Sequence, residues 1–203
     1  DKASSPINLY GATKLASDKL FTASNSYAGE HGTRFSVVRY GNVAGSRGSV
    51  IPFFREIRQN GEIPITNVNM TRFLLTLSEA VNTVIHAFEE MVGSEIFVRK
   101  APSVKITELA KIIAPGCLIK EIGMRPGEKL HEQLISIEES PYTYEFKNYY
   151  KILTPINNWN SSKERTKGGI KVKEEFFYVS DKNDWWLREN ELETWLEAIK
   201  DEN

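Results

Sequence analysis

Residues 1–21 read Asp-Lys-Ala-Ser-Ser-Pro-Ile-Asn-Leu-Tyr-Gly-Ala-Thr-Lys-Leu-Ala-Ser-Asp-Lys-Leu-Phe. Pro6 and Asn8 are residues that commonly start helices, and apolar side chains recur after them at helical spacing. The pattern predicts a helix from about Asn8 to about Glu30, which closes near a glycine. The chemistry of the segment therefore depends on the side chains that the first turns of this helix carry.

Tyr10 and Lys14 are four residues apart, so a helix places their side chains on one face, one turn apart. An ammonium near a phenol stabilises the phenolate, and this favours the tyrosine as a proton acceptor. The spacing alone is weak, because Tyr178 and Lys182 repeat it in a polar stretch that is typical of a turn. The surroundings of the first pair therefore have to carry the functional prediction.

The rest of the chain predicts short strands and helices in alternation. Residues 34–40 form an apolar, β-branched run, which predicts a buried parallel strand. Further strands are predicted at 63–66, 93–99, 117–122, 149–153 and 176–179, and helices at 50–59, 78–91, 106–113 and 191–199. Residues 157–169 are polar and contain glycines, and they predict a loop.

Two signatures carry a resemblance to a known family. The run Asp-Lys-Ala at 1–3, followed by Ile-Asn-Leu-Tyr-Gly-Ala-Thr-Lys at 7–14, resembles the extended short-chain dehydrogenase/reductase superfamily. More narrowly, it is similar to the inverting UDP-N-acetylglucosamine 4,6-dehydratases, which start pseudaminic-acid and some capsule pathways. The related retaining dehydratases have methionine where this chain has Tyr10, which favours the inverting branch. The second signature is Arg-Pro-Gly-Glu at 125–128.

The resemblance implies an α/β fold: the C-terminal part of a Rossmann-type doubly wound sheet plus a small mixed α/β substrate-binding domain. Residues 1–49 would belong to the NADP-binding domain, with a returning strand near 94–99, and residues 50–203 mainly to the UDP-sugar region and the C-terminal tail. The sequence lacks an initiator Met and opens directly on the motif, so we expect a C-terminal fragment. The glycine-rich dinucleotide loop would lie upstream, and we expect the fragment alone to be inactive.

Bulk composition excludes several classes of protein. The 203 residues have a formal net charge of -1, which gives no global attraction to nucleic acid or to a membrane surface. The single cysteine excludes an internal disulfide and favours a reducing compartment, so we expect a cytoplasmic protein. No apolar run reaches the ~18 residues of a membrane span. The three His residues lack zinc spacing, and we predict no metal.

A glycine-containing loop at 41–49 follows the predicted strand. Its glycines at 41, 45 and 48 do not have the spacing of a primary dinucleotide fingerprint, and a plain tight turn is an alternative. The resemblance instead places this loop beneath a nicotinamide. It implies that Tyr40 and Val43 contact the cofactor and that Asn42 contacts the substrate.

The remaining substrate contacts are implied by the same resemblance. Arg72 would face the nucleotide diphosphate, because a guanidinium binds phosphate in a bidentate manner; the alternative is a surface arginine. Arg125 and Glu128 would point into one cleft across a Pro-Gly bend and hold phosphate and sugar hydroxyls; the alternative is a salt-bridged turn. The complete predicted set is Asn42, Arg47, Gly48, Ser49, Val50, Ile51, Thr66, Arg72, Arg125 and Glu128.

The resemblance also implies a reaction. Tyr10 would take the proton of the C4 hydroxyl of UDP-N-acetylglucosamine while hydride passes to NADP (NAD being possible), and Lys14 would contact the nicotinamide ribose. Lys2 would remove the C5 proton, which requires a neutral amine. Asp1 would protonate the departing C6 hydroxyl, which requires a carboxylic acid. The product would be a 4-keto-6-deoxy sugar inverted at C5.

Two other functions stay open. A UDP-sugar 4-epimerase shares the Tyr10 and Lys14 pair but has no need of Asp1 and Lys2. A UDP-sugar-binding module without chemistry would tolerate Tyr10→Phe. We also expect a homo-oligomer.

Overall fold

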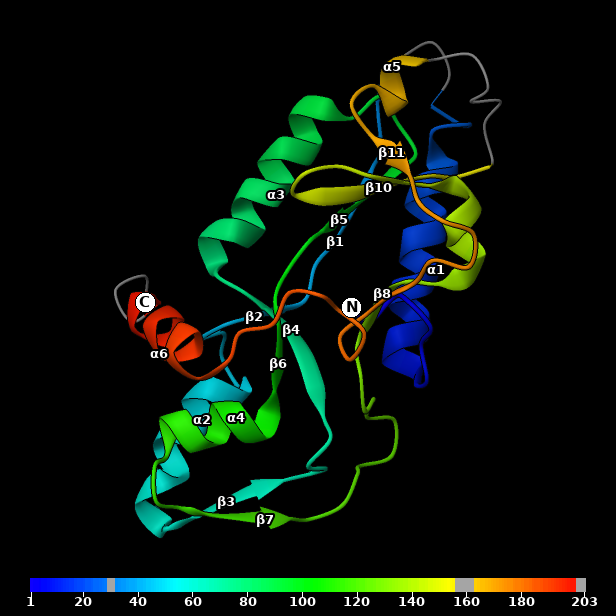
Figure 1. The fold of residues 1–203 in the computed structure, drawn as a ribbon. Coiled ribbons are helices and arrows are strands. Elements are labelled where there is room, and N and C mark those ends of the chain that lie inside the picture. The colour runs from blue at the N-terminus through cyan, green and yellow to red at the C-terminus, as the bar shows by residue number, and fades with distance from the viewer. Residues whose placement is uncertain (29–31, 156–162, 200–203) are drawn as a thin grey trace. The chain divides into compact units, whose positions relative to one another are not determined.

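The computed structural model describes residues 1–28, 32–155 and 163–199, and it divides into two compact units (Figure 1). Unit 1 consists of Asp1–Tyr40, Val81–Lys100 and Gln133–Tyr178. Unit 2 consists of Gly41–Ala80, Ala101–Glu132 and Val179–Asn203. The predicted end of the first helix at Glu30 and residues 157–162 of the predicted loop at 157–169 lie outside the described residues. In the described part of that loop, Lys163–Thr166 form the short helix α5, which the polar composition did not predict.

The helices and strands are mostly short. The α-helices are α1 (Leu9–Ser24), α2 (Val50–Ile57), α3 (Leu77–Glu90), α4 (Ile106–Ile113), α5 (Lys163–Thr166) and α6 (Glu189–Ala198), with 3-10 turns η2 (Arg58–Asn60) and η3 (Ile137–Tyr142). The strands are β1 (Val37–Arg39), β2 (Asn42–Val43), β3 (Glu62–Ile65), β4 (Thr71–Leu75), β5 (Glu95–Arg99), β6 (Ser103–Lys105), β7 (Leu118–Glu121), β8 (Gln133–Ile135), β9 (Thr143–Glu145), β10 (Tyr149–Leu153), β11 (Ile170–Lys171) and β12 (Tyr178–Val179).

Unit 1 is built on a five-stranded sheet in the order β1-β5-β10-β9-β11. β1 and β5 are parallel, with Val37 opposite Ile96, which confirms the predicted parallel strand at 34–40. β10 then pairs with β5 in the antiparallel direction. In Figure 1, α1 and α3 flank β1 and β5 from opposite sides. The sheet is therefore mixed, and the protein is of the mixed α/β class.

Helix α1 begins where the sequence predicts. Asn8 is its N-cap, and the side-chain oxygen of Asn8 accepts a hydrogen bond from the backbone N–H of Gly11 at 2.8 Å. The helix ends at Ser24, earlier than predicted. Asn25, its C-cap, keeps helical φ and ψ, and its side chain bonds both the N–H and the carbonyl of Phe35. These two bonds fix the chain that enters β1.

Unit 2 holds two small sheets, β2-β4-β6 and the parallel pair β3-β7. Its core is formed by one face each of α2, α4 and α6 together with β3, with Phe54, Leu109 and Leu192 almost fully buried. Gly41 precedes β2, and a Cβ at this position would lie 2.5 Å from the Cβ of Phe73. Only glycine lets the backbone approach β4 this closely.

Several predicted elements match the structure, whereas the predicted domain boundary does not match the two units. The helix at 106–113 and the strand at 149–153 have the predicted bounds, and Gly61 ends the α2 and η2 segment with φ of 74°. The expected return of a strand near 94–99 agrees with β5 lying in unit 1, whereas 133–178, expected in the substrate region, also belong to unit 1. The antiparallel pairing of β10 with β5 joins the segment 133–178 to the sheet of unit 1. The assignment of the two units to cofactor and substrate stays a prediction.

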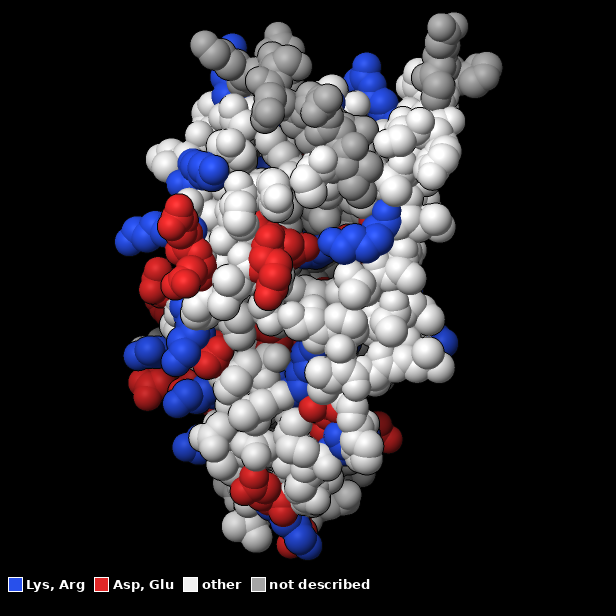
Figure 2. All heavy atoms as spheres, turned by 90° about the vertical axis from the view of Figure 1, so that its right-hand side faces the viewer, with Lys and Arg blue, Asp and Glu red and all other residues white. Residues whose placement is uncertain are grey.

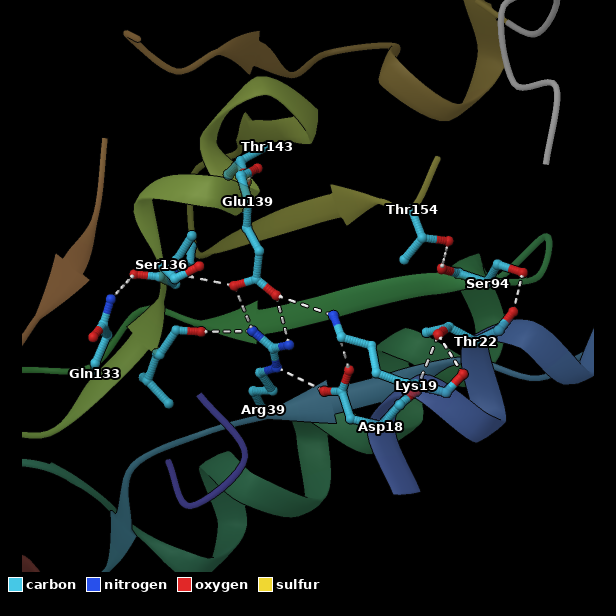
Figure 3. A network of polar contacts seen from close by, with 12 residues as sticks. Asp18, Lys19, Thr22, Arg39, Ser94, Gln133, Ser136, Glu139, Thr143 and Thr154 are labelled. Atoms are coloured by element: carbon cyan, nitrogen blue, oxygen red, sulfur yellow. Dashed lines mark hydrogen bonds and ion pairs between the residues drawn. The ribbon is translucent and has the colours of Figure 1, made fainter. Parts of the chain in front are cut away.

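A buried arginine connects three segments of unit 1 (Figure 3). Arg39, at the end of β1, is 3% exposed, and its guanidinium donates to Asp18 of α1, to both oxygens of Glu139 and to the carbonyl of Leu134. Burial opposes the charge on Arg39, but the bonds and charges of Glu139 and Asp18 outweigh burial and raise its pKa. The guanidinium therefore stays charged at every pH at which the protein folds.

The lowered pKa of Glu139 makes the stability of the protein depend on pH. Burial favours the neutral acid, but the bonds and charge of Arg39 outweigh burial and lower the pKa of Glu139 below its ordinary 4.5. The carboxylate therefore contributes stability above that ordinary value, and the contribution is lost as pH falls through the lower folded value. We expect Glu139→Gln to cost about 1.5–3 kcal/mol of unfolding free energy near neutral pH, and less in acid. Urea unfolding at a series of pH values measures the difference, and a pH-independent difference would contradict the assignment.

Candidate active-site residues and substrate cavity

Asp1 and Lys2 form an ion pair in unit 1. The Lys2 Nζ donates to Asp1 Oδ2 at 2.9 Å, with the Asp1 side chain 12% and the Lys2 side chain 41% exposed. The main-chain nitrogen of Asp1 donates to the carbonyl of Tyr40 at 3.2 Å. This backbone contact holds the pair beside the end of β1, and the half-exposed amine stays accessible.

Tyr10 and Lys14 lie on the same side of α1, as the spacing predicts. The Lys14 Nζ lies 5.4 Å from the centroid of the Tyr10 ring, within the range of a cation–π contact. Tyr10 is 60% exposed, so its ring stands on an open face of the helix. The pair is therefore free to meet a ligand.

Gly11 brings these two pairs into one neighbourhood. A Cβ on Gly11 would lie 2.9 Å from the carbonyl oxygen of Lys2 and 2.9 Å from the Cβ of Pro6. The segment that carries Asp1 and Lys2 thus packs directly against the first turn of α1, next to Tyr10. The sequence offers this signal only as a glycine inside a helix, where glycine is otherwise unfavourable.

Unit 2 contains a cavity of about 550 Å³, a size typical of small-ligand sites. The cavity lies between β2, β4, the start of α2 and the 122–128 segment. Of the predicted ligand contacts, it is lined by Asn42, Val43, Gly48, Ser49, Val50, Ile51, Thr66, Arg72, Arg125 and Glu128. Arg47 is exposed and is not among the described residues that line the cavity, and Tyr40 belongs to unit 1.

Two polar atoms at this cavity have no hydrogen-bond partner within the described part of the chain. They are Asn42 Oδ1 and Ser49 Oγ, each buried at the atomic level. Ser49 is the N-cap of α2, yet its side chain makes no capping bond. Buried polar groups are normally satisfied, and the N-terminus of a helix attracts anions. Both atoms are available to a polar ligand in the cavity.

Arg72 is used differently from the prediction. Its guanidinium donates to the carbonyls of Thr71, Lys129 and Leu130, and its Nε lies 3.7 Å from Glu132. Burial lowers the pKa of Arg72, partly offset by Glu132 and Glu128. Two of these hydrogen bonds and the ion pair with Glu132 hold the 129–132 segment, and a direct role of Arg72 toward phosphate stays a prediction.

The Arg125-Pro-Gly-Glu128 signature forms a tight turn. The backbone N–H of Glu128 donates to the carbonyl of Arg125 at 3.1 Å, and Gly127 has φ of 78°. The Glu128 carboxylate accepts from the backbone N–H of Arg125 at 3.2 Å. The turn leaves the Arg125 side chain exposed at the cavity wall.

Sequence reasoning missed several residues. The cavity is also lined by Phe53, Phe54, Glu56, Met70 and Ile122, whose types give no functional signal. His131, which sequence reasoning did not connect with the site, has its Nδ1 2.8 Å from Thr71 Oγ1, and Thr71 Oγ1 also bonds Ser180 Oγ at 2.7 Å. This chain of hydroxyl contacts fixes the start of β4, next to Arg72.

One face of the molecule carries charges of both signs. On the face in Figure 2, Lys and Arg side chains are interspersed with Asp and Glu, without a broad patch of one sign. No helix within residues 1–28, 32–155 and 163–199 is long and apolar enough to cross a bilayer. In the same described ranges, no three His, Cys, Asp or Glu side chains gather closely enough to hold a metal ion. The absence of metal, nucleic acid and membrane partners stays a prediction.

Known proteins similar to this chain agree with the resemblance read from its motifs. The chain is 53% identical over 199 residues to "UDP-N-acetylglucosamine 4,6-dehydratase (inverting)" of Campylobacter jejuni, covering 95% of this chain and 60% of that protein. It is 41% identical over 177 residues to "UDP-glucose 4-epimerase" of Rickettsia bellii, covering 85% of this chain and 52% of that protein. The chain thus spans about 60% of the length of the dehydratase, and less of the epimerase.

A solved structure supports the fold. The X-ray structure of Pen from Bacillus thuringiensis superposes with a TM-score of 0.84 at 33% identity, covering 98% of this chain and 61% of that one. The family model described as "Polysaccharide biosynthesis protein" matches residues 1–154. The match includes the Asp1–Lys2 and Tyr10–Lys14 pairs and most of the lining of the cavity. The chain therefore belongs to the polysaccharide biosynthesis protein family.

Proposed function

We propose that the protein containing this chain is an inverting UDP-N-acetylglucosamine 4,6-dehydratase. The observation that carries the proposal is the arrangement in unit 1, where an acid and an amine pack against the helix turn that presents Tyr10 and Lys14. The 53% identity to the Campylobacter dehydratase supports the same substrate. On this proposal the five-stranded sheet is the C-terminal part of a doubly wound sheet, completed by residues upstream.

The exposed Tyr10 and Lys14 pair fits a nicotinamide dinucleotide. A phenol oxygen and an ammonium on an open helix face can meet the ribose hydroxyls and the amide of such a cofactor. We propose NADP, with NAD as the alternative. The bound dinucleotide would supply a hydride acceptor and return the hydride to the sugar.

Tyr10 and Lys14 would begin the reaction. The Tyr10 oxygen would accept the proton of the C4 hydroxyl as the sugar is oxidised to a ketone. The Lys14 ammonium, 5.4 Å from the centroid of the Tyr10 ring, lies close enough for both groups to act on one ligand. The C4 ketone then makes the neighbouring C5 proton acidic.

The Asp1–Lys2 ion pair would carry out the loss of water. The mechanism requires an amine at Lys2 and a carboxylic acid at Asp1. A single proton transfer across their 2.9 Å hydrogen bond converts the ion pair into these two forms. Lys2 can then remove the C5 proton, and Asp1 can protonate the C6 hydroxyl as it leaves. One contact thus prepares both groups.

The cavity of unit 2 would bind the UDP moiety. The start of α2 offers backbone N–H groups and a positive dipole end to a diphosphate. Arg125 adds a charged donor, and Asn42 and Ser49 offer unpartnered polar atoms. Glu128 would accept from sugar hydroxyls.

Arg125 tests the nucleotide site. We expect Arg125→Ala to weaken binding of the UDP-sugar by about 10- to 100-fold, because a charge-assisted bond contributes roughly 1.5–3 kcal/mol. The KM and the Kd for UDP should rise while kcat changes little. Arg58→Ala is the matched control, since Arg58 is exposed in unit 2 and is not among the residues that line the cavity. Equal effects of both variants would remove Arg125 from the site.

A UDP-sugar 4-epimerase is the second candidate, favoured by the 41% identity to the Rickettsia protein. Mass spectrometry of the product separates the two. The dehydratase converts UDP-N-acetylglucosamine into a product lighter by one water, whereas an epimer keeps the mass of the substrate. A product of unchanged mass would overturn the dehydratase proposal. The cytoplasmic location and the homo-oligomeric state stay predictions.

A further inference from the structure

We propose that Arg39, Asp18 and Glu139 form a positioning clamp that sets helix α1, and with it Tyr10 and Lys14, for the chemistry. The inference rests on the proposed function and extends it to three residues that touch neither substrate nor cofactor. Figure 3 shows the three side chains converging from α1, β1 and η3.

The clamp joins α1 to strand β1 at Asp18, one helical turn after Lys14. Arg39 Nε donates to Asp18 Oδ2 at 2.8 Å, and both side chains are almost fully buried. Positions 10, 14 and 18 follow one another at a spacing of four, so they lie along one side of the helix. Asp18, which is bonded to Arg39 and would fix the rotation of α1, therefore lies one turn beyond Lys14 on the side of the helix that carries Tyr10 and Lys14.

Within the described part of the chain, most side chains in the N-terminal turns of α1 are exposed. Leu9 is 81% exposed and Tyr10 60%, and of residues 9–14 only Gly11 is buried. Farther along, the Ser94 hydroxyl donates to the carbonyl of Thr22, and the Asn25 side-chain amide donates to the carbonyl of Phe35. Of these three contacts of α1, the hydrogen bond of Asp18 with Arg39 lies nearest in sequence to Tyr10 and Lys14.

The geometry of the clamp favours one orientation. Glu139 accepts a two-pronged pair of bonds from Arg39 at 2.9 and 2.8 Å, while its oxygen Oε2 also accepts from the backbone N–H of Ser136. Lys19 Nζ lies 4.0 Å from Asp18 and 3.8 Å from Glu139, so two positive charges face two negative ones. Replacing such a buried network by apolar residues often stabilises a protein. On this proposal, the main contribution of the network is a fixed orientation of α1, and its contribution to stability is secondary.

The clamp also borders the segment that leads from Asp1 and Lys2 to α1. A cavity of about 340 Å³ in unit 1 is lined by Ala3, Ser4 and Pro6 on one side and by Arg39, Lys19 and Glu139 on another. Disorder in the clamp would therefore displace both the segment that carries Asp1 and Lys2 and the helix turn that carries Tyr10.

The test compares Asp18→Asn, Arg39→Lys and Glu139→Gln in the full-length protein, with Glu138→Gln as the exposed neighbouring control. We expect each clamp variant to lower kcat by about 10-fold or more, because small misplacements of reacting groups are costly. The KM should stay within about 2-fold. Hydrogen exchange of residues 9–17 should become faster in the clamp variants and stay unchanged in the control.

The two readouts separate the possible failures. A purely structural role would lower the unfolding midpoint but leave kcat and the exchange of residues 9–17 unchanged well below that midpoint, and this result would overturn the clamp. If Arg39→Lys fails to fold, Glu139→Gln and Lys19→Met test the clamp by the same two measurements. Lys19 is half-exposed and lies at the edge of the clamp, beside Asp18 and Glu139. A wild-type protein that makes no dehydrated product overturns the proposed function instead, and the exchange measurement still decides the clamp.

Discussion

Tyr10→Phe is expected to lower kcat for the dehydration of UDP-N-acetylglucosamine by about 10²- to 10⁴-fold, the range of general acid–base contributions. The variant removes only the oxygen that would accept the C4 proton. The ring stays in place beneath Lys14, so the KM should change little. Steady-state kinetics with the full-length protein measures both values.

Tyr27→Phe is the matched control for this variant. Tyr27 follows α1 in the same unit and is 88% exposed, so the loss of its hydroxyl should leave kcat unchanged. Full activity of Tyr10→Phe would remove the proton acceptor from the mechanism. Binding of UDP-sugars without any turnover, in both the wild-type protein and Tyr10→Phe, would instead favour a module without chemistry.

Lys2→Met is expected to separate the two halves of the reaction. The side chain keeps its length but loses the amine, so formation of the dehydrated product should fall by about 10²- to 10⁴-fold. Oxidation at C4 depends on Tyr10 and should persist, visible as absorbance of reduced nicotinamide in a single turnover. An epimerase would lose little activity, because it has no step at C5.

Lys147→Met is the control for Lys2→Met, since Lys147 is an exposed lysine of unit 1 outside the reactive segment. If Lys2→Met formed the dehydrated product at the wild-type rate, another base would have to remove the C5 proton. If it lost the oxidation step as well, the pair would serve substrate binding or the structure of the first turn.

Local signals made much of the fold predictable. Asn8 caps α1, Gly61 closes the segment after α2, and the apolar pattern of 106–113 gave the bounds of α4. The end of α1 escaped prediction because Asn25 bonds Phe35, ten residues later. The return of 133–178 to unit 1 depends on the pairing of β10 with β5, and a single sequence does not encode the partners of a strand in an obvious way.

The contact between Lys14 and Tyr10 was predictable because the two residues are near neighbours on one helix, whereas their chemical role stays a prediction. Arg39 looked like one polar residue in an apolar strand, and its partner Glu139 lies 100 positions away. Arg72 is the opposite case: the motif indicated phosphate, but its guanidinium donates to carbonyls of the 129–130 segment and of Thr71. Which donors remain for a ligand depends on tertiary contacts that residue types do not reveal.

The most direct measurement follows the full-length protein, UDP-N-acetylglucosamine and the cofactor in deuterated water by NMR. Lys2 and Tyr10 acting as proposed predict a 4-keto-6-deoxy product that carries solvent deuterium at C5 and is inverted at that carbon. A C4 epimer without deuterium at C5, or unchanged substrate, would contradict the account.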